Sequence, residues 1–113
     1  MDEKREIQEP SDYLLEIIGA YKDRGHDLVS LDQIKMVAMI LSDKGLPIYD
    51  FKDGGHTLER DLNMLNRDEN YLRCYFFNYE LTDSGNEFLK TTIIPIAGNQ
   101  RRIFYDTIDT IIS

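Results

Sequence analysis

Acidic and histidine side chains gather around a glycine pair in the middle of the chain, where they could exchange protons with a substrate. Asp50 and Asp53 precede Gly54-Gly55, and His56 follows. General acid–base catalysis uses these residue types. Asp and Gly also form turns, and the spacing Asp-x-x-Asp-Gly-Gly-His matches no catalytic motif. Nucleophilic catalysis would further need a serine or cysteine activated by a base, and we identify none. We therefore expect that the protein is not an enzyme.

A metal site is the second chemistry to consider. His26-Asp27 and Asp32 lie close together in the sequence. Zinc sites usually combine paired Cys or His residues, whereas the other histidine, His56, belongs to a separate glycine turn. No glycine-rich loop opens a helix in the way that cradles a phosphate. We expect no metal and no other cofactor. The single cysteine, Cys74, excludes an internal disulfide and is expected to be a small core residue.

Recognition of DNA bases by a helix is the third chemistry. The sequence predicts a helix at residues 57–68 whose buried stripe is Leu58, Leu62 and Leu65. Arginine can pair bidentately with guanine, and asparagine with adenine. The opposite face of this helix carries these residue types and no acid: Arg60, Asn63 and Arg67.

The same face has a plainer interpretation. A solvent-facing helix side collects polar residues, and arginine is a good helix former. Glu59 and Asp61 flank the face and would repel phosphates. A simple solvated surface therefore stays open beside DNA recognition. Further basic residues could contact the DNA backbone if they lie on the same side: Lys52, Arg73, Arg101 and Arg102.

The overall charge bears on these alternatives. The chain has 113 residues and a net charge of −8. Such a charge argues against non-specific nucleic-acid binding, which rests on Lys and Arg facing phosphates, but it is compatible with a local basic patch. No apolar run approaches the roughly 20 residues that span a bilayer, and the charged N-terminus is followed by no apolar segment. We expect a cytoplasmic protein with no membrane partner.

Hydrophobic periodicity and capping residues predict the elements that would position these side chains. We expect a flexible tail at residues 1–10 and a helix from Ser11 to Gly25. Ser30 and Gln33 form a capping box before a second helix, which is apolar on nearly every side and is therefore expected in the middle of the core. The later elements are a short strand at 48–51, a helix capped by Thr57, a strand at 70–81 broken near 77–78, and helices at 82–89 and 101–112.

One stretch carries a resemblance to a known fold. Tyr79 and Leu81 alternate with polar residues, as in a half-buried strand, and Thr82 can cap the helix that follows. This Tyr-x-Leu-Thr-x-x-Gly-x-x-Phe-Leu pattern resembles the end of many small winged-helix domains. With the segments at 31–41 and 49–62, residues 31–89 look like the winged helix-turn-helix folds of archaeal and phage regulators. They are less similar to Panacea-type antitoxin domains, whose Gly-Pro-aromatic element is absent here.

The resemblance implies an α+β, mostly helical fold: a winged helix-turn-helix with a small β-sheet and flanking N- and C-terminal helices, in a single domain at residues 11–113. It implies a DNA-binding protein that regulates transcription. The residues expected on double-stranded DNA are Arg60, Asn63, Arg67, Lys52 and Arg73. The alternative is a protein–protein interaction module on the same fold, an antitoxin or an adaptor without DNA binding, whose acidic surface would meet a basic partner.

Two apolar segments, the C-terminal helix and the aromatic run at 71–79, need a surface to pack against. The C-terminal helix could fold back on the first helix or pair with its twin in a two-fold dimer, which would set two recognition helices against two half-sites. We expect a homodimer. Its interface residues would be Ile103, Phe104, Ile108 and Ile111. The aromatic run at 71–79 could stack bases of a single strand, although alternating aromatics on a strand are more often core on one face.

Overall fold

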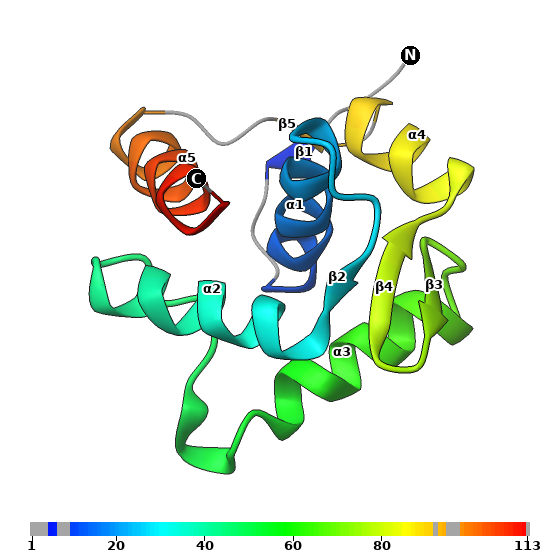
Figure 1. Ribbon diagram of the computed structural model, residues 1–113, viewed down its shortest axis with the longest axis horizontal. Helices are drawn as coiled ribbons and strands as arrows, with labels where there is room; N and C mark the ends of the chain where they lie inside the picture. Colours follow the sequence, from blue (N-terminus) through cyan, green and yellow to red (C-terminus); the bar gives the residue numbers. More distant parts are fainter. Residues whose placement is uncertain (1–4, 7–9, 92, 95–97, 113) are drawn as a thin grey trace.

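The computed structural model describes residues 5–6, 10–91, 93–94 and 98–112 (Figure 1). These residues form an α+β, mostly helical fold, which confirms the expected fold class at this coarse level. Its helices are α1 (Pro10–Asp23), α2 (Leu31–Asp43), the short 3₁₀-helix η1 (Phe51–Asp53), α3 (His56–Arg67), α4 (Asp83–Thr91) and α5 (Gly98–Ile112). Its strands are β1 (Arg5–Glu6), β2 (Val29–Ser30), β3 (Leu72–Tyr75), β4 (Asn78–Leu81) and β5 (Ile93–Ile94).

The strands make two small sheets. β2, β4 and β3 form an antiparallel sheet in that order, so β4 is central and pairs with both neighbours. β1 and β5 pair in parallel, with Arg5 opposite Ile93. The expected tail therefore contains a strand, and the first helix begins at Pro10, where proline fits the first turn. Residues 1–4 and 7–9 of that tail lie outside the described residues.

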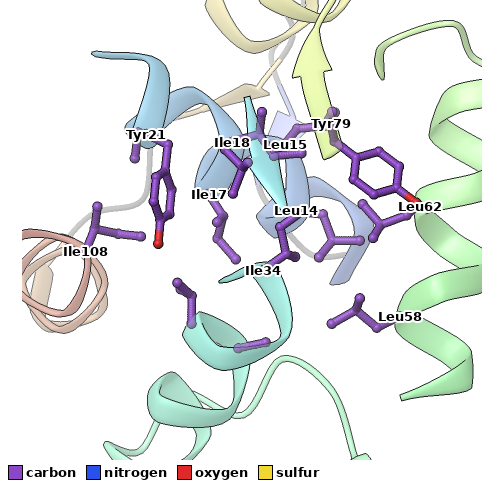
Figure 2. Packing of buried hydrophobic residues seen from close by; sticks show 14 of the residues in the cluster. Leu14, Leu15, Ile17, Ile18, Tyr21, Ile34, Leu58, Leu62, Tyr79 and Ile108 are labelled. Atoms are coloured by element: carbon purple, nitrogen blue, oxygen red, sulfur yellow. The ribbon is translucent and has the colours of Figure 1, made fainter. Parts of the chain in front are cut away.

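The centre of the core is α1. It packs against α2, α3, α4, α5 and β4, and Figure 2 shows its Leu14 and Ile17 among side chains from several of these elements. Four of its residues have no exposed surface: Leu14, Leu15, Ile17 and Ile18. The expectation that the second helix would lie in the middle of the core is wrong. The outer face of α2 exposes Met36 and Met39, because only one side of this helix is covered by the rest of the chain.

Capping residues fix the starts of α2 and α4 as expected. The Gln33 backbone N–H donates to Ser30 Oγ at 3.1 Å, and the Ser30 N–H donates to Gln33 Oε1 at 2.9 Å. This is the reciprocal capping box. At α4, the Gly85 N–H donates to Thr82 Oγ1 at 3.0 Å, which confirms the Thr82 cap.

Two predicted strand assignments need correction. No strand forms at residues 48–51; the chain passes through an irregular segment into η1, and Tyr49 is buried there. The strand expected at 70–81 is a tight hairpin of β3 and β4, and its two-residue turn is Phe76-Phe77. The turn lies one residue before the expected break, because the register pairs Tyr75 with Asn78. Within the described ranges, no helix has both the length and the apolar character that a bilayer crossing needs.

Candidate functional site

The third helix, α3, presents the polar face that the sequence indicates. Its stripe of Leu58, Leu62 and Leu65 is buried, and α3 packs against α1 and β3; Figure 2 shows Leu58 and Leu62 directed from this helix into the core. Arg60, Asn63 and Arg67 are exposed, and the Arg60 side chain is 77% exposed. We call these three residues the outer face of α3. Their side chains are available to a ligand, since none is used to build the core.

The two acids that flank the outer face are engaged with other parts of the chain. Glu59 Oε2 accepts from Lys35 Nζ of α2 at 3.1 Å. Asp61 Oδ2 accepts from the Tyr49 hydroxyl at 2.7 Å, and its side chain is only 18% exposed. Burial and this carboxylate raise the pKa of Tyr49 far above its ordinary value, so the hydroxyl stays protonated as a donor. Lys35 therefore offsets the charge of Glu59, whereas the neutral Tyr49 hydroxyl does not offset the charge of Asp61, whose Oδ1 lies 4.0 Å from Arg60 Nε.

The turn that leads into α3 is built by Asp53. Its carboxylate accepts from the Gly55 N–H at 2.9 Å, the Thr57 N–H at 3.0 Å and the Thr57 hydroxyl at 2.5 Å. The Thr57 hydroxyl and the two backbone donors lower the pKa of Asp53 to about 2. Thr57 was expected to cap this helix, which is wrong: the N-cap residue is Gly55, and Thr57 donates to Asp53 instead.

The aspartates around the glycine pair have structural partners. Asp50 accepts from the Lys52 N–H at 2.9 Å and caps η1. Gly54 and Gly55 have φ of +72° and +87°, a region that glycine occupies without a steric penalty. A Cβ on Gly55 would lie 3.1 Å from Lys35 Cε, so glycine also makes room for the side chain that holds Glu59. This cluster therefore shapes the entry to α3.

The other basic residues divide into two groups. Lys52 is exposed on η1, just before α3. Arg73 lies on β3, just after α3, and donates to Glu80 at 3.3 Å while its side chain stays 58% exposed. Arg101 and Arg102 belong to α5, which lies across α1 from the hairpin (Figure 1). Arg101 stacks 4.9 Å from the Tyr105 ring centroid, and Arg102 lies 3.8 Å from Asp106. They do not join the outer face of α3.

The metal candidates do not converge. In the part of the chain that the structure describes, no three His, Cys, Asp or Glu side chains are close enough together to hold a metal ion. The His26 ring meets Tyr21 edge-on, with centroids 6.0 Å apart. Cys74 is exposed, contrary to the expectation of a core position. The reason is that β3 is an edge strand of which only Leu72 is buried.

The C-terminal helix folds back on its own domain. Phe104 and Ile108 have no exposed surface, and Ile103 and Ile111 are half-buried against the core. The Phe104 ring lies 6.3 Å from that of Tyr13 on α1. Two of the four residues expected at a dimer interface are thus covered within one chain and are not free to contact a second copy. A homodimer stays a prediction, and one that used α5 would have to use the half-buried pair.

Sequence inspection missed the hairpin tip. Phe76 and Phe77 are 96% and 70% exposed, with φ of +49° and +65°. The aromatic run was expected to alternate along one strand, whereas the turn carries these two rings into solvent and only Tyr79 is buried. The signal that could have found the turn is Asn78, whose side-chain amide donates to the carbonyls of Tyr75 and Phe76.

Comparison with known proteins adds no relative from which a function could be transferred. No protein-family model matches the chain, and no curated protein or solved structure was found to be similar to it. Its function is therefore inferred from its own geometry.

Proposed function

We propose that this chain is a small winged-helix DNA-binding protein that acts as a transcriptional regulator, with α3 in the major groove. The observation that carries the proposal is the outer face of α3, on which Arg60, Asn63 and Arg67 are exposed while the leucine stripe holds the helix to the core. Arginine and asparagine are the residues that pair bidentately with guanine and adenine.

The order of the elements supports the proposal. α1, β2, α2 and α3 are followed by the hairpin of β3 and β4, and β2 completes the sheet beside β4. In a helix-turn-helix the second helix of the motif enters the major groove, and here that helix would be α3. The hairpin would then be the wing.

One local charge pairing also supports the proposal, although the net charge is −8. Lys35 offsets Glu59, and Asp61 accepts from Tyr49. The acids that remain near these arginines are Asp61, whose Oδ1 lies 4.0 Å from Arg60 Nε, and Asp68 and Glu69, which follow Arg67 and are exposed. Lys52 and Arg73 lie on segments that adjoin the two ends of α3, where they could contact phosphates.

The test starts from a pool of random duplexes, because the sequence recognised is unknown. Duplexes enriched by the wild-type chain are measured by fluorescence anisotropy at two salt concentrations. We expect Arg60→Ala with Arg67→Ala to weaken binding roughly 30-fold or more, since each bidentate contact contributes about 1–3 kcal/mol. The matched control is Arg101→Ala with Arg102→Ala, which removes the same charge from α5 and should change affinity little.

Two results would overturn the proposal. One is that no duplex is enriched at moderate salt. The other is that both double variants weaken binding equally, because the effect would then come from net charge. Either result would favour the alternative, a protein–protein interaction module on the same fold.

A further inference from the structure

The hairpin tip holds two phenylalanines in a backbone conformation that phenylalanine disfavours. A two-residue hairpin turn with positive φ at both positions normally contains Asn-Gly or a similar pair. Here Phe76 and Phe77 occupy it at φ +49° and +65°. Non-glycine residues in this region are uncommon, and such strain tends to collect at functional sites. Two phenylalanines do not maximise the stability of such a turn, so we look for a functional reason for their presence.

The surrounding hydrogen bonds fix the position of the tip. The Asn78 side-chain amide donates to the carbonyls of Tyr75 at 3.1 Å and Phe76 at 3.2 Å. The Leu31 N–H, at the start of α2, donates to the Phe77 carbonyl at 2.8 Å. The rings are therefore presented from a backbone that is tied to both the sheet and α2, which lowers the entropic cost of binding a partner.

Exposed apolar side chains are concentrated at this tip and on α2. Six large hydrophobic residues are exposed among those that the structure describes, and four belong here. Scattered exposed hydrophobics are normal, whereas a grouped set marks an interaction surface. We call this set the apolar strip: Phe76, Phe77, Met36 and Met39.

The strip has a groove at one end. A depression of about 400 Å³ separates the tip from the first turn of α2. It is lined by Ser30, Leu31, Asp32, Phe76, Phe77 and Asn78. Met36 and Met39 follow Asp32 by four and seven residues, so they share its side of the helix. A ligand that enters the groove would continue along the outer side of α2.

The charges on the outer side of α2 itself are negative. Asp32 and Asp43 are exposed at the two ends of the outer side of α2, and neither forms an ion pair with another described residue. Of the nearby cations, Lys35 is engaged with Glu59, and Lys44, the C-cap residue that follows Asp43, is exposed. Phosphates of DNA and anionic lipid surfaces would be repelled here, and a second copy of the chain would bring its own excess of acids. A cationic ligand complements this surface.

We propose that the apolar strip docks a cationic segment of a partner protein. A large apolar side chain of that segment would enter the groove beside Phe77. A Lys or Arg next to it would pair with Asp32, and a second one farther along the segment would pair with Asp43 at the other end of α2. The methionines suit such a role because their side chains adapt to irregular surfaces. The proposal does not depend on DNA binding by α3.

A library of random 12-residue peptides displayed on phage provides the probe, and enriched peptides are then measured by fluorescence anisotropy. We expect wild-type protein to enrich peptides that combine Lys or Arg with Leu, Phe or Trp. Phe76→Asn with Phe77→Gly should weaken the enriched peptides at least tenfold. This variant suits the positive φ values, so it should keep or raise the melting temperature while it loses binding.

Matched controls separate the strip from net charge and general hydrophobicity. Leu28→Gln removes an exposed apolar side chain outside the strip, and Asp23→Asn with Asp27→Asn removes two charges outside it. Both should leave affinity within about twofold, whereas Asp32→Asn with Asp43→Asn should lower it at least threefold. The proposal is overturned if no peptide is enriched, if enriched peptides lack basic residues, or if the control variants lose as much affinity as the strip variants.

Discussion

Thr82 and Gly85 join the sheet to α4 through contacts that use a side-chain hydroxyl at one position and the absence of a side chain at the other. The Thr82 hydroxyl donates to the Asn70 carbonyl at 2.7 Å and accepts from the Gly85 N–H at 3.0 Å. The Thr82 N–H donates to the Tyr71 carbonyl at 3.1 Å. The Leu-Thr-x-x-Gly pattern thus encodes a junction: threonine caps the helix and ties it to the segment before β3, while glycine lets the two backbones approach.

At this scale we predict that Gly85→Ala is strongly destabilising. A Cβ at this position would lie 2.2 Å from the Tyr71 carbonyl oxygen, so the backbone must shift. We expect a loss of about 2–3 kcal/mol in the free energy of unfolding, measured by urea denaturation. The control is Gly19→Ala in α1, where the Cβ would meet only side-chain atoms, of Leu89 at 3.1 Å and of Leu81 at 3.6 Å. A loss as small in Gly85→Ala as in the control would show that this junction is loose.

At the scale of elements, the segment between α2 and α3 decides how the candidate recognition helix is held. Tyr49 lies in this segment and donates to Asp61 of α3, and Lys35 of α2 pairs with Glu59. Both contacts fall on the flanks of α3. They fix the helix without using its outer face, which leaves Arg60 and Arg67 free of a core role.

We predict opposite effects for two removals of a tyrosine hydroxyl. Tyr49→Phe removes a hydrogen bond to a carboxylate and should cost about 1–2 kcal/mol of stability. Tyr21→Phe should be neutral or stabilising, because the Tyr21 hydroxyl is buried with no hydrogen-bond partner among the described residues. Urea denaturation of both variants at pH 7 measures the difference. Equal losses would mean that the contact between Tyr49 and Asp61 does not hold the segment.

At the scale of the whole molecule, α5 closes the side of the core opposite the hairpin (Figure 1). Arg24, in the turn just after α1, pairs with Asp109 of α5 at 2.6 Å, and the Tyr105 hydroxyl reaches Glu16 at 3.4 Å. Burial raises the pKa of Glu16, while the Tyr105 hydroxyl acts in the opposite direction. These polar contacts surround the buried Phe104 and Ile108, so the helix is an integral part of the domain.

We predict that Phe104→Ala lowers stability by about 3–5 kcal/mol, because it empties a fully buried site. Ile103→Ser with Ile111→Ser should instead leave a folded chain, since both side chains are half-buried, and should split the predicted homodimer. Light scattering at tens of micromolar measures the mass. A wild-type mass of 13.2 kDa, that of one chain, would reject the homodimer.

Much of the local structure could be predicted from the sequence because it depends on neighbours in the chain. The leucine stripe of α3, the capping box at Ser30 and the Thr82 cap all repeat or pair within a few residues, so periodicity and capping rules reach them. The polar outer face of α3 follows from the same geometry. The identity of a ligand does not, because exposed arginines suit DNA and solvent equally well.

Periodicity and capping rules could not predict contacts between segments that are distant in the sequence. α1 became the centre of the core in place of α2, which is similarly apolar, because the hairpin, α3 and α5 all pack against α1. β1 formed only because β5 lies beside it. The helix periods, the caps and the acidic charge were determined by the sequence alone. Only the tertiary structure decided that α5 covers α1, that two acids beside Arg60 are partnered and that Phe76 and Phe77 face solvent, since each depends on which surfaces meet when the chain closes.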